Sequence, residues 1–271
     1  MIGILNGVVD DVDNIKVSPL SRAYTFGDAV YEVIPYAEDF IHFNQHIKRL
    51  LQSCKSLNID IDEQILKDDI LKLKSSATNT GYVYYQVSKG VDKIRGHIWQ
   101  GGEPERFGYF VEHDLGPQPP KSLLVYPDPR WKRCDIKTTG LTGNILSLEK
   151  SIARGFDDVL YEQDGIITET SASNIFFIQN DLVCTPSLAN NILEGVTRME
   201  VFNICYQNDI EVKEGIFSVT DILCSDAVFL TSSISGIRKV SYIDNTQIPT
   251  DNSIVDKLQK IYFKNNLNLV V

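Results

Sequence analysis

A proline-rich stretch divides the sequence into two parts of unequal length. Residues 114–122, DLGPQPPKS, contain three of the ten prolines in the 271-residue chain. Proline removes a backbone donor and fixes one dihedral angle, so such a run ends helices and strands and commonly joins domains. A chain of this length is large enough for two domains of ordinary size. We therefore expect an N-terminal domain over 1–113, an interdomain linker over 114–122 and a C-terminal domain over 123–271.

The N-terminal part combines strand and helix patterns. An Asn6-Gly7 pair between two apolar runs predicts a hairpin over 3–11. The stretch 28–36 is rich in Val, Ile and Tyr and predicts a strand, with FIHF at 40–43 pairing back on it. The remaining predictions are a helix capped by Asn44, a helix over 62–76 and strands over 82–90 and 106–113.

The C-terminal part has shorter strands interrupted by helices. We expect strands near 122–126, 158–162, 174–179, 182–184 and 226–231, and helices near 143–154, 196–208 and 252–265. This mixture predicts an α/β (α+β) fold class. A small N-terminal α/β domain would be followed by a larger C-terminal α/β domain built as a pseudo-barrel.

Charge and cysteine usage exclude several classes of protein. The formal net charge of −10 argues against binding to nucleic acid or to an anionic membrane. The five cysteines are widely spaced, with no C-x-x-C pair, which indicates neither a disulfide framework nor a zinc site. The four histidines form no H-E-x-x-H pattern, so we expect no metal. No segment approaches the roughly 20 apolar residues that span a bilayer, and we expect a cytoplasmic protein.

A cationic segment contains the first candidate for chemistry. RWKRCDIK, residues 130–137, holds four cations and ends at Lys137. Most lysines are solvated surface cations, which is one interpretation. The other is an amine kept neutral for chemistry, because nearby cations such as Arg130 and Arg133 and partial burial both lower a lysine pKa.

Two further segments could bind an anion. Gly195-Val196-Thr197 opens an amphipathic helix, where free N–H groups, the helix dipole and a hydroxyl would suit a phosphate. An ordinary capped helix would show the same pattern. The segment TSSIS, residues 231–235, follows an apolar strand and supplies more hydroxyls, Ser233 among them, although serine-rich loops are common.

Three other positions carry polar groups of catalytic type. Glu169, in ITETSASN, precedes a predicted strand and would need a cationic partner if buried; it could equally be a surface turn residue. Arg95 and His97, in RGH, with Tyr31 far upstream, offer a guanidinium fork and further donors for a carboxylate. In isolation they would be solvated loop side chains. Together, a lysine, a carboxylate and phosphate-binding elements are what a pyridoxal phosphate enzyme requires.

The order and spacing of these motifs resemble the class IV (fold type IV) pyridoxal phosphate aminotransferases. The similarity extends from about residue 3 to about residue 265. It is carried by SRAYTFGDAVYEV at 21–33, HIKRL at 46–50, RWKRCDIK at 130–137, ITETSASNIF at 167–176, ILEGVTR at 192–198 and FLTSSIS at 229–235.

The resemblance implies a role for each matching residue. Lys137 would form the Schiff base with pyridoxal 5'-phosphate and then move the proton, and Glu169 would pair with the pyridine nitrogen. The phosphate would be held by Arg49, Val196, Thr197 and Ser233, with Leu193 packed against the ring. The substrate carboxylate would be bound by Tyr31, Arg95 and His97. In that family the Arg and His come from the second subunit, so the resemblance implies a homodimer with shared active sites.

The R-x-H pair at 95–97 favours the D-amino acid branch of this family. The implied reaction converts D-alanine and 2-oxoglutarate to pyruvate and D-glutamate. Two enzymes on the same fold remain as alternatives: a 4-amino-4-deoxychorismate lyase, which would eliminate pyruvate, and a branched-chain amino acid aminotransferase. A protein that binds the cofactor without catalysis is the alternative from another class.

Overall fold

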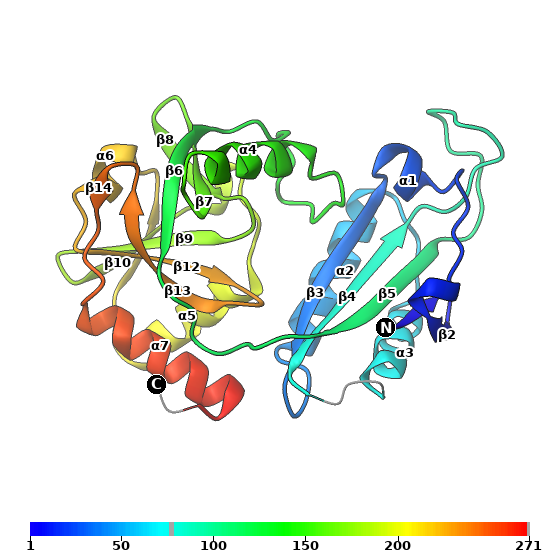
Figure 1. The fold of residues 1–271 in the computed structure, drawn as a ribbon, viewed down its shortest axis with the longest axis horizontal. Helices are drawn as coiled ribbons and strands as arrows, with labels where there is room; N and C mark the ends of the chain where they lie inside the picture. The colour runs from blue at the N-terminus through cyan, green and yellow to red at the C-terminus, as the bar shows by residue number, and fades with distance from the viewer. Residues whose placement is uncertain (76–78, 270–271) are drawn as a thin grey trace. The chain divides into compact units, whose positions relative to one another are not determined.

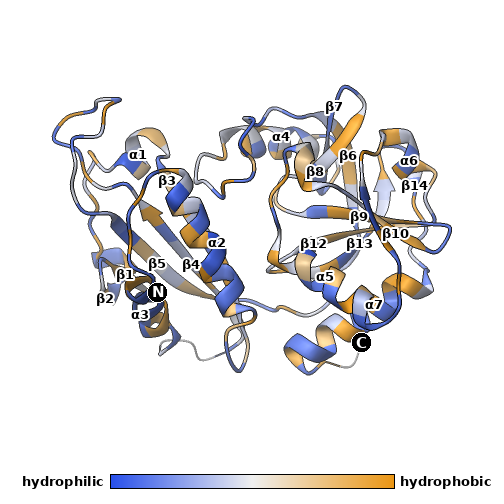
Figure 2. Ribbon diagram, turned by 180° about the vertical axis from the view of Figure 1, so that it is seen from behind, coloured by the Kyte–Doolittle hydropathy of each residue, from blue (hydrophilic) through white to orange (hydrophobic). Residues whose placement is uncertain are grey.

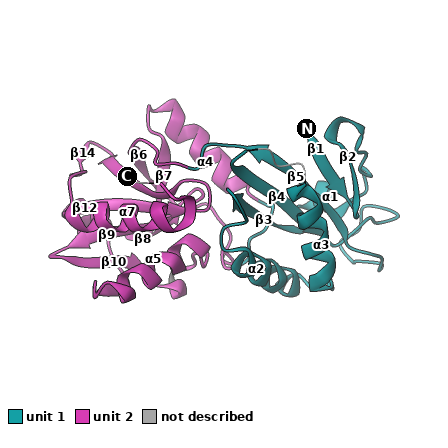
Figure 3. Ribbon diagram, turned by 90° about the horizontal axis from the view of Figure 1, so that it is seen from below, with its two compact units in different colours: residues 1–115, 136–140 teal, residues 116–135, 141–271 magenta. Residues whose placement is uncertain are grey.

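The chain, in a computed structural model that describes residues 1–75 and 79–269, forms two compact units (Figures 1 and 3). The first holds Met1–Leu115 and Ile136–Gly140, and the second holds Gly116–Asp135 and Leu141–Val271. The last position of the expected 62–76 helix and the final two of the C-terminal domain lie outside the described residues.

The first unit is built on an antiparallel sheet with strand order β2-β1-β5-β4-β3. Its strands are β1 (Ile2–Leu5), β2 (Val8–Asp11), β3 (Ala29–Tyr36), β4 (Gly81–Ser88) and β5 (Glu105–Glu112), and its helices are η1 (Val12–Asn14), α1 (Arg22–Phe26), α2 (Phe43–Ser56) and α3 (Glu63–Lys74). Side chains of β3 alternate between the faces. Val30, Glu32 and Ile34 are buried, whereas Tyr31 points to the other face. The buried apolar residues pack with α2 and α3 into one core.

Most of the elements expected in this unit are confirmed, with two corrections. The hairpin at the N-terminus and the three long strands lie within one or two residues of their predicted limits. The strand expected at 40–43 is wrong, because only an isolated bridge joins Tyr36 to Phe40. The chain turns there through the bond from the Ile41 N–H to the Pro35 carbonyl (2.8 Å). As a result α2 begins at Phe43 with His42 as its N-cap, so the Asn44 cap was also wrong.

The second unit is built on a mixed sheet with order β11-β10-β9-β12-β13-β6-β7-β8, and β14 pairs with β13. Its strands are β6 (Lys121–Pro127), β7 (Asp158–Gln163), β8 (Ile166–Thr170), β9 (Asn174–Gln179), β10 (Leu182–Pro186), β11 (Val212–Gly215), β12 (Ala227–Ser232), β13 (Gly236–Ile243) and β14 (Thr246–Gln247). Its helices are α4 (Thr142–Ala153), η2 (Leu188–Asn190), α5 (Val196–Gln207), α6 (Val219–Leu223) and α7 (Ser253–Leu267). The end strand β8 also packs beside β9 and β10, so the sheet curves back on itself as the predicted pseudo-barrel.

The central strands β9 and β12 of this sheet are buried and largely apolar on both faces. Figure 2 colours each described residue by its hydropathy. Along β9, Ile175 and Phe177 contribute to one core, whereas Phe176 and Ile178 contribute to the core on the opposite face, with α5 and α7. The sequence of a strand that is buried on both faces is a continuous run of hydrophobic residues. This property explains why β9 and β12 were predicted correctly and the more polar β13 was missed.

Residues 136–140 join the first unit, although the expected C-terminal domain contained them. This segment runs along β3, which is the edge strand of its sheet. The N–H of Tyr31 donates to the carbonyl of Lys137 (2.9 Å), and the N–H of Thr139 donates to the carbonyl of Ala29 (2.9 Å). An edge strand has free backbone groups that another segment can satisfy. The second unit begins at Gly116, inside the proline-rich stretch that was expected to be a linker.

Candidate active site

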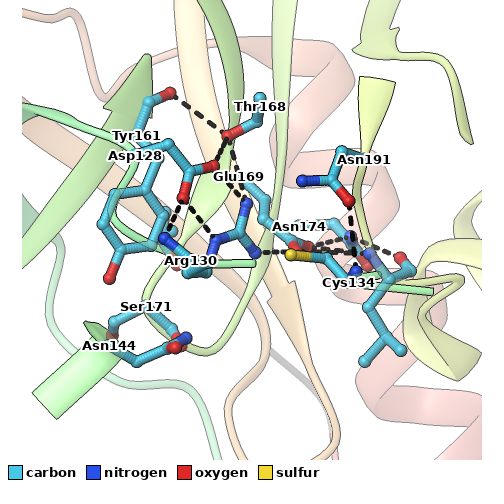
Figure 4. A network of polar contacts seen from close by, with 12 residues as sticks. Asp128, Arg130, Cys134, Asn144, Tyr161, Thr168, Glu169, Ser171, Asn174 and Asn191 are labelled. Carbon is cyan, nitrogen blue, oxygen red and sulfur yellow. Dashed lines mark hydrogen bonds and ion pairs between the residues drawn. The ribbon is translucent and has the colours of Figure 1, made fainter. Parts of the chain in front are cut away.

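The second unit places a buried carboxylate among three donors (Figure 4). Glu169 lies near the end of β8 and is 6% exposed. Its carboxylate accepts hydrogen bonds from the Arg130 guanidinium, from Asn174 Nδ2 (2.9 Å) and from the Leu193 N–H (3.2 and 3.3 Å to its two oxygens). Glu169 is therefore not a surface turn residue, and Arg130 is the cationic partner that its burial requires.

Arg130 is itself held by a second carboxylate. Its Nε donates to Asp128 Oδ1 (2.9 Å) and its Nη2 to Asp128 Oδ2 (2.7 Å). Nη2 also lies 3.3 Å from Thr168 Oγ1, and the guanidinium stacks 4.8 Å from the centroid of the Tyr161 ring. A planar guanidinium with these contacts on several sides has one orientation, and that orientation aims Nη1 at Glu169.

The two carboxylates that share Arg130 differ in their proton affinity. Burial raises the pKa of Glu169 above its ordinary value, against the opposing effects of Arg130 and the Leu193 N–H. Burial also acts to raise the pKa of Asp128, but its hydrogen bonds and charge interaction with Arg130 outweigh burial and lower it. Glu169 is thus the member of the pair whose charged form is less well stabilised by its surroundings.

Glu169 retains room for one further donor. An ionised carboxylate offers about four lone-pair positions. Arg130, Asn174 and the Leu193 N–H supply three donors, and the Leu193 N–H is shared between the two oxygens. A protonated ring nitrogen fits the remaining position, which is the contact expected for the pyridine ring of pyridoxal 5'-phosphate.

Asn174 links Glu169 to the start of α5. Its Nδ2 donates to the Leu193 carbonyl (2.8 Å) as well as to Glu169. A Cβ atom at Gly195, the N-cap of α5, would lie only 2.1 Å from Asn174 Oδ1. Glycine is therefore required at position 195 so that Asn174 can reach Glu169.

The start of α5 suits an anion such as the cofactor phosphate. Gly195 provides no side-chain cap, so within the described residues no cap hydrogen bond uses the N–H groups of the first turn. Thr197 is buried. Ser233 is half-buried in the turn that follows β12. These residues fit a bound phosphate in chemical type.

A buried hydroxyl without a partner lies at the same end of this sheet. Thr231 Oγ1 has no hydrogen-bond partner in the described part of the chain. Thr231 stands opposite Asn174 in the register of β12 and β9. A buried polar atom without a partner is uncommon in native proteins, and a bound polar ligand would satisfy it.

The first unit places the candidate lysine on an aromatic ring. Lys137 Nζ lies 4.3 Å from the centroid of the Tyr31 ring. Within residues 1–75 and 79–269, no carboxylate forms an ion pair with this amine. The backbone of Lys137 is held by β3 and by the Ser53 hydroxyl (3.3 Å from the Lys137 nitrogen). The amine is thus placed by its backbone and remains available for chemistry.

Arg95 and His97 lie together on the connection between β4 and β5, and both contact Phe26. The Arg95 guanidinium is 4.5 Å from the centroid of the Phe26 ring, and the His97 ring is 5.8 Å from it, edge to face. Tyr31, on the sheet itself, stacks instead on Tyr84 (5.6 Å between centroids). Within the first unit, the structure therefore groups Tyr31 with Lys137 and Arg95 with His97.

Arg49, expected to hold the phosphate, forms a buried ion pair. Its Nε lies 2.7 Å from Glu32 Oε1 and its Nη2 lies 2.8 Å from Glu32 Oε2. His46 Nδ1 is 2.7 Å from the same carboxylate. Burial would raise the pKa of Glu32, but Arg49 and His46 outweigh it and lower the pKa strongly. The pair orients Arg49, and its role toward a phosphate remains a prediction.

The two arginines of the cationic segment before Lys137 are paired with carboxylates. Arg133 binds Asp135 through two contacts of 2.8 Å, and Arg130 binds Asp128 and Glu169. Arg130 enters the site through Glu169, and the structure adds Asp128 and Asn174, which were not named from the sequence. The signal that could have found them is the need of a buried carboxylate for partners.

Comparisons with known proteins place the chain in a family. Residues 29–243 match the family described as amino-transferase class IV, and the chain belongs to this family. A D-alanine aminotransferase from Listeria monocytogenes serotype 1/2a (strain 10403S) is 31% identical over 255 residues, covering 90% of this chain and 88% of that protein.

Solved structures of several enzymes share the fold. The branched-chain aminotransferase from Thermoproteus uzoniensis with norvaline superposes with a TM-score of 0.90 at 22% identity, covering 99% of this chain and 95% of that chain. A putative 4-amino-4-deoxychorismate lyase from Legionella pneumophila superposes with a TM-score of 0.84 at 26% identity, covering 94% and 96%. These likenesses confirm the predicted fold class. The protein is an aminotransferase that depends on pyridoxal 5'-phosphate and acts on amino acids and 2-oxo acids.

Three further features of the described residues concern metal ligands, membrane helices and thiols. No three His, Cys, Asp or Glu side chains among them are grouped as metal ligands. No helix of the described ranges is long and apolar enough to cross a membrane. All five cysteines are free thiols, and four of them are buried.

Proposed function

We propose that this enzyme transfers the amino group of D-alanine to 2-oxoglutarate, giving pyruvate and D-glutamate. The observation that carries the proposal is the Arg95 guanidinium, which is exposed next to His97 and pairs with no carboxylate in the described part of the chain. A guanidinium that no protein carboxylate neutralises is suited to bind the carboxylate of a substrate. The likeness to D-alanine aminotransferases supports the same substrate.

Lys137 and Glu169 are proposed to perform the central steps. Bound pyridoxal 5'-phosphate supplies an electron-withdrawing ring that stabilises negative charge at the substrate Cα. Lys137 Nζ would hold the cofactor, and the same amine would move the proton at the substrate Cα. Glu169 uses its remaining acceptor position to keep the ring nitrogen protonated, and Arg130 with Asn174 holds the carboxylate for that contact.

The other predicted residues are proposed to bind and orient. The start of α5, with Val196, Thr197 and Ser233, holds the phosphate, and Arg49 adds positive charge. Leu193 packs against the ring. Tyr31 joins Arg95 and His97 in binding the substrate carboxylate, which sets the face of Cα that Lys137 can reach.

We further propose that the enzyme is a cytoplasmic homodimer in which Arg95 and His97 serve the partner's substrate. Ile94 and Ile98 flank this pair and are 73% and 78% exposed. Exposed apolar side chains close together are typical of an interface. Analytical ultracentrifugation of the purified protein tests this, and a monomer at micromolar concentration would contradict it.

The first experiment is the visible absorbance of the cofactor-loaded enzyme before and after D-alanine or L-leucine, with D-glutamate measured by chiral chromatography. A band bleached by D-alanine but not by L-leucine, with D-glutamate formed, supports the proposal. Bleaching by L-leucine alone would assign the branched-chain reaction. The likeness to a lyase structure motivates a third arm: pyruvate released from 4-amino-4-deoxychorismate, with neither amino acid active, would assign elimination instead.

A further inference from the structure

Arg22 lies at the base of the segment that carries the proposed substrate-binding pair. Residues 89–104 connect β4 to β5 without regular structure, projecting from the sheet next to α1 (Figure 1). Connections longer than about 12–15 residues are commonly functional. Backbone bonds hold the base of this one: the Arg22 N–H donates to the Gly90 carbonyl (2.9 Å), and the Asp92 N–H donates to the Leu20 carbonyl (3.2 Å).

The Arg22 side chain reaches beyond this base to the middle of the R-G-H motif. Its Nη1 donates to the Gly96 carbonyl (3.0 Å) and to Asp92 Oδ2 (2.7 Å), and its Nε donates to Asp28 Oδ2 (2.6 Å). Among the described residues, the bond to Gly96 is the one hydrogen bond that ties residues 93–98 to a residue outside the 89–104 connection. Gly96 stands between Arg95 and His97, so a contact at its carbonyl acts on both side chains.

Phe26 adds a second link between Arg22 and the same two residues. It lies four positions after Arg22 in α1, so both side chains project from one face of that helix. The Arg22 guanidinium is 4.7 Å from the centroid of the Phe26 ring. Arg95 and His97 contact the same ring, at 4.5 and 5.8 Å.

The position of residues 89–104 also depends on the charge of Arg22. Asp92 is 6% exposed, and its Oδ1 has no hydrogen-bond partner in the described part of the chain. Arg22 is the cation that balances this carboxylate. A buried carboxylate that loses its partner must reach water, and Asp92 can do so only if the segment moves.

We propose that Arg22 is a positioning residue for substrate binding: through Gly96, Asp92 and Phe26 it holds Arg95 and His97 where they meet the substrate carboxylate. This inference rests on the proposed function, in which Arg95 and His97 bind that carboxylate. Arg22 itself contacts neither substrate nor cofactor in this scheme.

Arg22→Lys tests the proposal, because a single ammonium keeps the charge but cannot reach Asp28, Asp92 and Gly96 together. In the cofactor-loaded enzyme we expect KM for D-alanine to rise about ten-fold while kcat stays within about two-fold. Trypsin should cut after Lys93 and Arg95 about ten-fold faster, as followed by mass spectrometry. Asp92→Asn, which leaves Arg22 in place, is a second variant. It should also raise KM for D-alanine and speed up tryptic cleavage after Lys93 and Arg95.

Arg106→Lys is the matched control. Arg106 is a largely buried arginine of the same unit that pairs with Asp69 (2.8 Å), away from residues 93–98. The Arg106→Lys variant should have a lower free energy of unfolding, but its KM for D-alanine and its rate of tryptic cleavage after Lys93 and Arg95 should not change.

A double-mutant cycle with Arg95→Ala separates the possible outcomes. If Arg22 acts through Arg95, the KM effect of Arg22→Lys disappears when Arg95 is alanine. Two results would overturn the role of Arg22 and leave that of Arg95 intact. The first is an unchanged rate of tryptic cleavage in Arg22→Lys. The second is faster cleavage but an unchanged KM in Arg22→Lys, when Arg95→Ala does raise KM. An unchanged KM in Arg95→Ala would instead overturn the substrate-binding assignment of Arg95, and the inference about Arg22 with it.

Discussion

Asn174 Nδ2 lies 2.9 Å from Glu169 Oε2 and 2.8 Å from the Leu193 carbonyl, so one amide group joins the end of β8 to the segment before α5. Glu169 is the proposed partner of the cofactor ring, and α5 is the proposed phosphate site. Asn174 thereby couples the two parts of the proposed cofactor site within one unit. The contact has direct consequences for stability and cofactor binding.

Asn174→Ala should destabilise the apoprotein by about 1–3 kcal/mol, because a buried carbonyl and a buried carboxylate each lose a donor. It should also weaken cofactor binding, since Glu169 loses part of its support. Urea unfolding and titration with pyridoxal 5'-phosphate measure the two effects. Asn203→Ala, on the exposed side of α5, is the control and should stay within about 0.5 kcal/mol of the unaltered protein. Equal effects of the two substitutions would contradict the coupling.

Gly195→Ala should act on the same contact from the other side. The added Cβ would lie 2.1 Å from Asn174 Oδ1, so the asparagine must move away from Glu169. We expect a loss of about 1–3 kcal/mol, typical of overpacking, together with weaker cofactor binding. Gly140→Ala, whose Cβ would meet its nearest neighbour at 3.7 Å, is the control for stability. Unimpaired cofactor affinity in Gly195→Ala would show that α5 and Glu169 are independent.

Lys137→Ala should abolish transamination and remove the visible band of the attached cofactor, because no other amine replaces Nζ. The fold should persist, since the contacts of Lys137 with β3 and Ser53 come from its backbone. Circular dichroism and thermal unfolding check the fold, and coupled assays check the activity. Lys132→Ala, in the same cationic segment, should retain activity. Turnover in Lys137→Ala comparable to that of the unaltered enzyme would refute the assignment of the catalytic lysine.

His46 should make stability depend on pH. Burial lowers the pKa of His46 below its ordinary value near 6.5, although Glu32 acts in the opposite direction. Below pH 6.5 the unfolded chain therefore binds a proton at this position that the native protein does not. The stability contributed by His46 is complete above pH 6.5 and is lost as the pH falls through the native pKa.

Urea unfolding of the unaltered protein and of His46→Gln between pH 7.5 and 5 measures this effect. The stability advantage of the unaltered protein should shrink as the pH falls, with a slope of at most about 1.4 kcal/mol per pH unit. The other three histidines are present in both proteins and cancel in the difference. An advantage that grows towards pH 5 would mean that the native protein holds a proton on His46.

Local sequence patterns determined most of the elements and the family. Alternation and hydrophobic runs identified β3, β4, β9 and β12, because burial on one or both faces of a sheet leaves a direct trace in the order of residues. Motif spacing identified the class of enzyme, which the family match confirms. The strands β8, β11, β13 and β14 are short or more polar, so their hydrophobic pattern in the sequence is weaker, and they were not predicted.

The tertiary structure alone decided which charges are paired and which remain available. Arg130 and Glu169 are separated by 39 residues, and only the parallel pairing of β6 with β7 and the return of β8 bring them together. Lys137 joined the first unit because the edge of β3 offered backbone partners to residues 136–140. Such contacts depend on where distant segments meet in space, and a local pattern of residues carries no record of that.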